Sequence, residues 1–531
     1  MKKRFVAAML AGTMALSILA GCGTSEDTNS VGTSENSNSE LVFVNYRDIR
    51  DLNPHLYAGE MYAQSMLYDT LVSITDDGYE GCLAESWEIS EDGKIYTFKI
   101  REGVTFSDGA VCDANAILAN FNAIIANKER HTWLEMMNLL VGVSAPDDYT
   151  FVIELSEAYY PMLTELGCIR PFAMISPNCM IDGQTKDGVN GYIGTGPYVL
   201  TDFVTDEYAV FERNENYWGE LPAIEKITVK VIPDNQTRIM ALESGEIDLI
   251  FGKNMLDADA ISQYTDSDKF TVSLSDPTST RHIVLNTTND ILSDVTVRQA
   301  LQHATDRNAI SEGIFYGLEQ PADTLYSKTV PYCDVDLEPY EYSADTASEM
   351  LEKAGWIMGK DGIRYKDGQK LELELLYNSD SVTEKTISEY LQSEYAKLGI
   401  SINIHGEEEQ SYRDSMKAGN FDMVFNICWG MPYDPQSSLA AMRAPVYGDY
   451  AAQLGLEDKA EIDKAITDIL TSTDETERQE LYTFVLTRLH EDAVYIPLTY
   501  ECNKALYTSD LQGVHFGTDQ YDVPFADMYF E

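Results

Sequence analysis

The side chains that most often catalyse reactions or bind metal ions are scattered along this chain of 531 residues. It has no H-E-x-x-H zinc motif, no G-x-S-x-G nucleophile elbow and no phosphate-binding loop. An isolated histidine is more often a hydrogen-bonded residue of the core or surface than a metal ligand. The seven histidines lie far apart, at His55, His131, His282, His303, His405, His490 and His515. The sequence therefore gives no positive support for an enzyme.

Two acidic segments are the next candidates for ion binding. Residues 334–338 (DVDLE) and 407–409 (EEE) carry the carboxylates that Ca²⁺ prefers. Neither has the spacing of an EF-hand loop, and runs of acidic residues are usually solvated surface. Neither segment therefore predicts a metal site.

The cysteines follow no metal-binding or disulfide pattern. Seven follow Cys22, at Cys82, Cys112, Cys168, Cys179, Cys333, Cys428 and Cys502. An odd number without C-x-x-C spacing argues against a complete disulfide framework and against a zinc knuckle. We expect most of them to be buried and reduced, although one pair could still form a disulfide after export.

Composition and charge exclude further classes of protein. With 44% hydrophobic and 11% aromatic residues the chain can bury a core, and its length predicts more than one domain. Its 37 basic and 88 acidic residues give a net charge of −51. Such a surface repels phosphate backbones, so we expect no nucleic-acid partner.

The N-terminus has the pattern of an export signal. Three basic residues precede an apolar stretch from Phe5 to Ala20, which is shorter than the roughly 20 residues that a membrane-spanning helix needs. The sequence Leu-Ala-Gly before Cys22 resembles the lipobox of bacterial lipoproteins, in which that cysteine receives a lipid. We therefore predict a signal peptide over 1–21, lipidation of Cys22 and a polar, disordered tether over 22–40. The alternative is an ordinary signal peptide in which Cys22 is incidental.

The rest of the chain alternates between helix and strand patterns. Alternating apolar residues predict strands at 95–100 and 226–232. Apolar residues at helical spacing predict helices at 114–127, with Asp113 as N-cap, at 345–354, ended by Gly355, and at about 475–490. There is no internal repeat, so the pattern favours a multidomain α/β protein.

Several motifs resemble those of the peptide/nickel class of extracellular solute-binding proteins. They are 87–93 (WEISEDG), 96–98 (YTF), 101–109 (REGVTFSDG), 194–198 (GTGPY) and 213–219 (RNENYWG). The resemblance covers residues 41–531 and implies the two-lobed, Venus-flytrap fold of periplasmic binding proteins. It places lobe 1 at 41–278, with 500–531 returning to it, lobe 2 at 279–499, and the hinge near 273–282 and 495–501.

Within this class the chain is most similar to the nickel-binding branch. The discriminating segments are 53–57 (NPHLY), 63–66 (AQSM), 130–135 (RHTWLE), 170–172 (RPF) and 429–435 (WGMPYDP). The resemblance implies an extracytoplasmic, lipid-anchored receptor of an ABC importer. It would capture a nickel–chelator complex by hinge closure and deliver it to a permease and its ATPase. We expect a monomer without a resident cofactor.

The resemblance also implies a ligand pocket. Arg130 and Arg170 match two arginines that bind the carboxylates of the chelator, as the planar, permanently charged guanidinium suits. The residues that match the apolar and aromatic walls are Tyr57, Met61, Trp133, Trp429 and Tyr433. Tyr521 takes the place of a threonine that lines the pocket.

The chain departs from the family at the one residue able to bond the metal directly. The resemblance implies a histidine after Met442-Arg443-x-Pro445, where this chain has Val446 and Tyr447. A neutral tyrosine is a poor nickel ligand beside imidazole. Tyr447 therefore argues against a direct bond to the metal from this position, whereas binding of the chelate is retained; whether another protein atom bonds the metal stays open.

Three alternatives remain open. A dipeptide or oligopeptide receptor of this fold would hold the peptide ammonium with an aspartate where this chain has Met431, and a buried ammonium without a counter-charge is costly. A receptor for another metal, carried by an amino-acid-derived metallophore, stays open because Tyr447 replaces the histidine. An exported hydrolase would need a nucleophile and base that no motif supplies.

Overall fold

The computed structural model describes residues 39–75, 78–428 and 435–531. The predicted signal peptide, Cys22 and nearly all of the tether lie outside these residues, as do Trp429, Met431 and Tyr433. Within the described residues, no helix combines the length and the apolarity needed to cross a bilayer.

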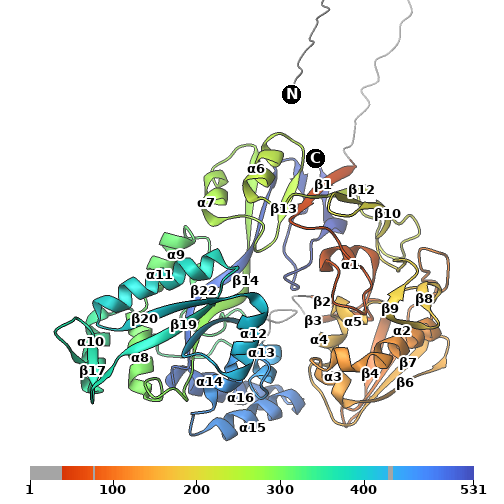
Figure 1. Cartoon of the computed structure of the whole chain (residues 1–531). Coiled ribbons are helices and arrows are strands. Elements are labelled where there is room, and N and C mark those ends of the chain that lie inside the picture. The colour runs from red at the N-terminus through yellow and green to blue at the C-terminus, as the bar shows by residue number, and fades with distance from the viewer. Residues whose placement is uncertain (1–38, 76–77, 429–434) are drawn as a thin grey trace, which may run out of the picture. The chain divides into compact units, whose positions relative to one another are not determined.

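An eleven-stranded sheet is the largest feature of the described residues (Figure 1). Its order is β10-β11-β12-β1-β13-β22-β14-β21-β19-β20, and β15 pairs with β22 outside this path. The strands are β1 (Glu40–Asn45), β10 (Tyr198–Val204), β11 (Tyr208–Arg213), β12 (Lys226–Val231), β13 (Leu249–Phe251), β14 (Phe270–Leu285), β15 (Gln320–Pro321), β19 (Glu372–Asn378), β20 (Ser401–Glu407), β21 (Met423–Cys428) and β22 (Tyr495–Thr508).

The two long strands β14 and β22 connect the two halves of this sheet. They pair antiparallel from Phe270↔Thr508 to Val284↔Tyr495 and lie side by side in Figure 1. Almost every residue of β22 is buried, which is the pattern of a strand covered on both faces.

A separate four-stranded sheet carries helix α2 (Ala114–Ala126) on one face. Its order is β4-β5-β7-β6, with β4 (Ala84–Ile89), β5 (Ile95–Ile100), β7 (Thr150–Leu155) and β6 (Leu140–Asp147). Asp113 caps α2 by accepting hydrogen bonds from the N–H groups of Asn115 and Ala116, both at 2.9 Å. The predictions of β5, of α2 and of its cap are thus confirmed.

Short elements surround these two sheets. Near the small sheet lie α1 (Met61–Leu67), the 3₁₀ helix η1 (Lys128–His131), α3 (Glu135–Leu139), α4 (Met162–Leu166), α5 (Ile169–Phe172), β2 (Val72–Thr75), β3 (Gly78–Gly81), β8 (Met180–Ile181) and β9 (Gln184–Val189). Beside β13 lie α6 (Asn235–Glu243) and α7 (Ala258–Ile261), and near the C-terminus β23 (Leu511–Gln512) pairs with β24 (Tyr529–Phe530).

The remaining helices pack around β14, β19, β20 and β21 (Figure 1). They are α8 (Val295–Ala304), α9 (Arg307–Ile314), α10 (Ala344–Lys353), α11 (Val382–Lys397), α12 (Glu409–Ala418), α13 (Pro435–Ala441), α14 (Gly448–Gln453), α15 (Lys459–Thr471) and α16 (Glu475–Glu491), with a small sheet of β16 (Ile357–Met358), β17 (Arg364–Lys366) and β18 (Gln369–Lys370). The predictions of α10 and α16 are confirmed to within one residue. Gly355, just after α10, adopts φ +92°, a left-handed conformation that favours glycine.

Apolar side chains form several core clusters. One contains Phe121 of α2, Phe151 of the small sheet, and Tyr482 and Val485 of α16, so these two groups of elements are in contact. All seven cysteines of the described residues are buried, as predicted.

Candidate functional site

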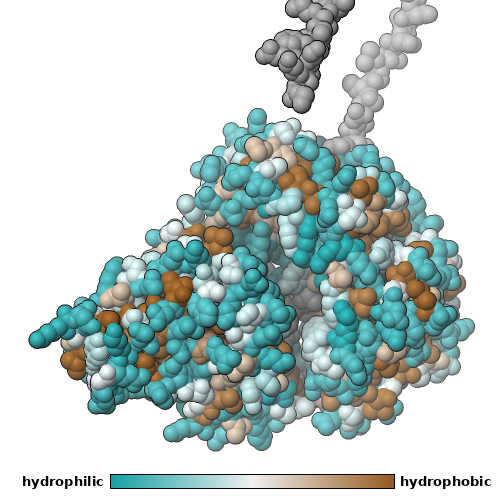
Figure 2. Space-filling view, viewed as in Figure 1, coloured by the Kyte–Doolittle hydropathy of each residue, from teal (hydrophilic) through white to brown (hydrophobic). Residues whose placement is uncertain are grey.

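A cavity of about 870 Å³ lies where these groups of elements meet. Its walls come from segments far apart in the sequence: the residues after β1, the start of α1, the end of β13, β14, the first turn of α11, the end of β21, β22 and residues 520–523. Figure 2 shows the described part of the molecule hollowed between these elements. Cavities of roughly 300–1,000 Å³ bind small molecules.

Tyr57 and Trp133 form an aromatic wall of the cavity, and His131 supports it from behind. The Trp133 Nε1–H donates a hydrogen bond to Tyr57 Oη at 2.8 Å, and His131 Nδ1 lies 2.6 Å from the same oxygen. The Tyr57 and Trp133 ring centroids are 5.9 Å apart at 67°, an edge-to-face arrangement. These contacts hold both rings in place before a ligand binds.

The aromatic wall carries no charge at neutral pH. Burial raises the pKa of Tyr57 to about 12, so its hydroxyl keeps its proton. Burial, together with the neighbouring Arg130, lowers the pKa of His131 to about 4. The wall therefore offers stacking surface and one hydroxyl group.

Arg170 brings a positive charge to the cavity that has no ion-pair partner among the described residues. Its Nε is buried without a hydrogen-bond partner, and no ion pair of Arg170 is present within the described residues. Burial lowers the pKa of Arg170, and Glu60 and Asp519 act in the opposite direction, but a guanidinium stays charged. A buried charge without a partner is costly. An anionic group of a ligand that pairs with Arg170 would remove this cost, so the position favours binding of an anion.

Met61 and Tyr521, two of the predicted site residues, also line the cavity. Met61 begins α1 and is only 8% exposed, whereas Tyr521 is 47% exposed in the segment 520–523. Met61 thus forms part of the apolar wall, and Tyr521 lies near the opening.

Arg130 and Tyr447 lie at the edge of the cavity rather than on its lining. Arg130 is exposed, and its guanidinium carbon is 5.7 Å from the Tyr57 ring centroid. Neighbouring residues of a 3₁₀ helix point about 120° apart, so burial of His131 turns Arg130 outward. Tyr447 is half-buried and directly precedes α14. Burial raises the pKa of Tyr447, and the charge of Arg413 on the cavity wall lowers it.

The remaining predicted site residues are Trp429 and Tyr433, which lie outside the described residues. Among the residues that are described, no group of three or more histidine, cysteine, aspartate or glutamate side chains is arranged to hold a metal ion. The described cavity wall thus has aromatic and cationic groups suited to an organic anion.

Comparison with known proteins identifies the family of this chain. The sequence pattern of the bacterial extracellular solute-binding proteins, family 5 (middle region), matches residues 78–449. The chain belongs to this family. Family 5 proteins deliver solutes to the permease and ATPase of ABC importers, so the chain is an extracytoplasmic solute-binding protein and not an enzyme.

Alignments with individual relatives extend over almost the whole chain. The chain is 41% identical over 486 residues to the nickel-binding periplasmic protein of Escherichia coli (strain K12), covering 91% of this chain and 93% of that protein. It is 27% identical over 560 residues to the periplasmic oligopeptide-binding protein OppA of Salmonella typhimurium, covering 98% of this chain and 97% of OppA. The crystal structure of NikA from Brucella suis in complex with Fe(III)-EDTA is 43% identical, with a TM-score of 0.90, over 93% of this chain and 100% of that one. The predicted fold class, α/β and two-lobed, is confirmed.

Most of the charged groups in the cavity of this family 5 protein lie outside the motifs of its sequence. The basic residues on the lining are Arg47, Arg50, Arg170, Lys253, Arg281 and Arg413, and the acidic ones are Glu60, Glu384, Glu501 and Asp522. The cavity is therefore locally rich in positive charge on a chain whose net charge is −51. Apart from Arg170, no motif signals these residues.

Glu501 is the centre of one such charged group. It accepts hydrogen bonds from Ser279 and Arg281, and Lys253 Nζ lies 3.2 Å from its carboxylate. Burial alone would raise the pKa of Glu501, but Arg281 and Lys253 hold it well below its usual value. Glu501 lies on β22 and Arg281 on β14, so this network fixes the two connecting strands beside the cavity.

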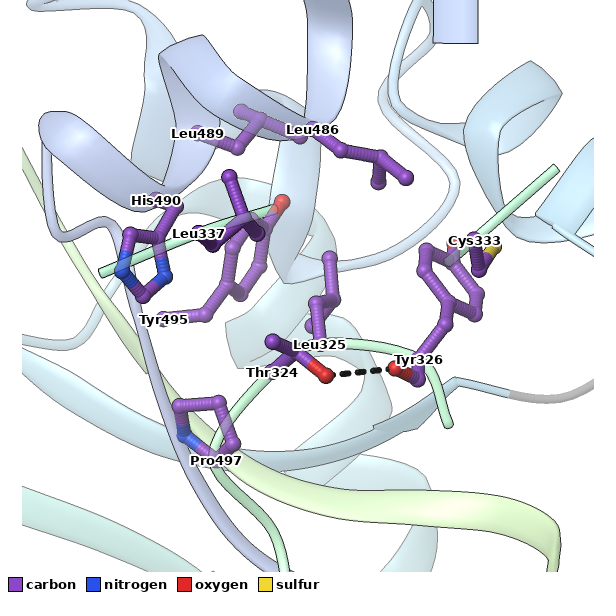
Figure 3. A pocket seen from close by; sticks show the side chains of 10 residues that line it. All are labelled: Thr324, Leu325, Tyr326, Cys333, Leu337, Leu486, Leu489, His490, Tyr495 and Pro497. Atoms are coloured by element: carbon purple, nitrogen blue, oxygen red, sulfur yellow. Dashed lines mark hydrogen bonds between the residues drawn. The ribbon is translucent and has the colours of Figure 1, made fainter. Parts of the chain in front are cut away.

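A second, much smaller pocket lies among apolar side chains between β22, α16 and residues 324–337 (Figure 3). It holds about 20 Å³, which is close to the space of one water molecule. Leu325, Leu337, Leu486 and Leu489 line it, and Thr324 Oγ1 donates to the Tyr326 carbonyl at 2.6 Å. This pocket is a gap in the core and not a ligand site.

Proposed function

We propose that this family 5 protein captures nickel inside a small chelator that carries carboxylates, for example histidine, and delivers the complex to its permease. The observation that carries the proposal is Arg170, a guanidinium without a partner among the described residues, beside the aromatic wall of Tyr57 and Trp133. The 41% identity to a nickel-binding periplasmic protein supports the choice of metal. The chelator, and not the metal, makes the contacts with the protein.

The predicted site residues keep their roles in this proposal, except that Arg170 and Arg130 no longer have the same role. Arg170 binds a carboxylate directly, whereas Arg130 acts from the edge through its position over the Tyr57 ring. Met61, Trp133 and Tyr521 complete the described wall. Trp429 and Tyr433 are proposed as further aromatic wall, and Tyr447 as a neighbour that does not bond the metal.

The same geometry suits a different metal in a similar chelator, because the protein supplies no metal ligand in this proposal. The relative from Brucella suis was crystallised with Fe(III)-EDTA, which supports recognition through the chelator. The cavity of about 870 Å³ also exceeds the needs of a bare ion many times over.

We further propose that the protein is a monomer, anchored by a lipid on Cys22 through the tether 22–40. Its lobes are 41–278 with 500–531, and 279–499, and they close about the strands β14 and β22. The long antiparallel pairing of these strands between the two halves of the large sheet supports this division.

The test is isothermal titration calorimetry of the protein without its first 38 residues, which keeps all of β1. We expect the complex of nickel with two histidines to bind far more tightly than free Ni²⁺. Equal or stronger uptake of the free ion would contradict the proposal. Native mass spectrometry of protein purified from its own host would identify the chelator and the metal.

A further inference from the structure

Arg47, Arg50 and Glu60 form an ion cluster on the cavity wall that the proposed function does not use. Arg47 Nε lies 2.7 Å and Arg50 Nη2 lies 2.9 Å from the same oxygen, Glu60 Oε1. Glu60 is 10% exposed, whereas the two arginines are 43% and 40% exposed. Two guanidinium groups thus share one carboxylate oxygen, and the cluster keeps a net positive charge.

The local backbone is arranged around this cluster. Arg50 adopts φ +55°, a left-handed conformation that is uncommon for residues other than glycine. Its N–H is held by Asp48 Oδ1 at 3.0 Å. Such conformations persist where the surroundings over-determine them, and they concentrate at binding sites.

Glu60 is also in an unusual position for a glutamate. It is the N-cap residue of α1, yet its side chain caps no backbone N–H group of that helix. Its carboxylate points instead to the two arginines, and Asn45 Nδ2 approaches its other oxygen at 3.4 Å. The side chain therefore stabilises the arginine pair rather than the helix.

The cluster and Arg170 belong to the same part of the cavity. Arg50, Glu60 and Arg170 line the same cavity, and, consistent with this, Glu60 raises and Arg50 lowers the pKa of Arg170. When all four side chains are ionised, the group of Arg47, Arg50, Arg170 and Glu60 carries three positive charges and one negative charge. A neutral ligand would leave that excess uncompensated.

We infer that Arg47 and Arg50 are a second carboxylate-binding subsite, which Glu60 occupies as an internal carboxylate when no ligand is bound. This inference rests on the proposed function and narrows its substrate class. The preferred solute is a chelate of net negative charge with at least two carboxylate groups facing outward, one for Arg170 and one for the arginine pair. A neutral complex uses Arg170 alone.

The test compares two nickel complexes of different charge on the same protein by calorimetry. Nickel–EDTA is a dianion with outward carboxylate oxygens, and nickel with two histidines is neutral. We expect Arg50→Gln and Arg47→Gln each to raise the Kd of the dianion by about tenfold or more, and that of the neutral complex by less than about threefold. Arg488→Gln, an arginine of α16 in an ion pair outside the cavity, is the matched control and should change neither.

Glu60→Gln is an independent test, because it should lower the Kd of the dianion whereas the arginine variants raise it. The amide keeps a hydrogen-bond acceptor but removes the competing charge, so the dianion should bind more tightly and the neutral complex about as before. Circular dichroism of each variant checks that it is folded.

Two results would overturn the inference. One is an equal loss of affinity for both complexes in Arg47→Gln and Arg50→Gln, and the other is weaker binding of the dianion by Glu60→Gln. In either case the proposed function stands, because the wild type still binds a chelate. If the wild type binds neither complex, both the inference and the proposed function are wrong.

Discussion

At the scale of single residues, Arg170 is the side chain on which the proposed chelate recognition most depends. A charged hydrogen bond contributes roughly 1.5–3 kcal/mol, and no described side chain forms an ion pair with Arg170. We therefore expect Arg170→Ala to weaken binding of the nickel–histidine complex by about that amount, measured by calorimetry. Unchanged affinity would remove Arg170 from the site.

Arg130 serves as the matched comparison for Arg170. The resemblance predicts equal roles for both arginines, but Arg130 is exposed and contacts the site through the Tyr57 ring. An exposed cation–π contact contributes about 0.5–1 kcal/mol. Arg130→Ala should therefore weaken binding by less than Arg170→Ala, and the reverse order would show that Arg130 contacts the ligand directly.

Tyr447 stands at the position where the family resemblance implies a metal-bonding histidine. Its pKa is raised by burial, so the hydroxyl is neutral and a weak ligand. We expect Tyr447→His to add a nitrogen ligand that X-ray absorption detects as a changed nickel coordination. An identical spectrum in the variant would show that position 447 does not reach the metal.

At the scale of elements, Glu165 holds the start of α3, just after Trp133. Its carboxylate accepts hydrogen bonds from the N–H groups of Glu135 and Met136, both at 3.1 Å, and from Tyr159 Oη at 2.6 Å. Burial raises the pKa of Glu165 to about 7 from the ordinary 4.5, despite these bonds.

This raised pKa predicts a pH dependence of folding stability. Between about pH 4.5 and 7 the folded protein keeps a proton that the unfolded chain releases, so stability from this group is lost as pH rises through that range. We expect Glu165→Gln to flatten the fall in the free energy of unfolding between pH 5 and 7, measured by urea denaturation. Glu88→Gln, an exposed residue of β4, should leave the slope unchanged; an unchanged slope in Glu165→Gln would contradict the prediction.

At the scale of the whole described chain, Tyr160 joins the small-sheet side to α15 and α16. Its N–H donates to the Leu470 carbonyl at 3.0 Å, and its hydroxyl donates to Glu475 Oε1 at 2.8 Å. The Arg478 guanidinium carbon lies 3.4 Å from the centre of its ring. These contacts bridge the two proposed lobes without touching the cavity.

Tyr160→Ala should therefore shift the protein toward an open form. A ligand that binds the closed form then loses affinity in proportion to the closed fraction, so we expect a similar loss, of about threefold to tenfold, for every ligand. Small-angle X-ray scattering of the ligand-bound variant should give a larger radius of gyration than the wild type. Tyr342→Ala, at an exposed tyrosine, is the control; a loss confined to one ligand would contradict this role.

The sequence by itself determined the local elements and the family. The ends of β5 and α2 follow from alternation, helical spacing and the Asp113 cap, which act over a few residues. The motifs that indicated the family also placed Arg170, Tyr57 and Trp133 at the site, because short segments with fixed roles are visible in one dimension.

Only the tertiary structure decided which charges meet in the cavity. Lys253 and Glu501 are 248 positions apart, and Arg47 and Glu60 are 13 apart across a loop with no regular spacing. Whether a basic residue faces the cavity, as Arg50 does, or solvent, as Arg130 does, depends on how distant strands and helices pack around it. Coulomb interactions act through space rather than along the chain, so no sequence pattern could pair these groups.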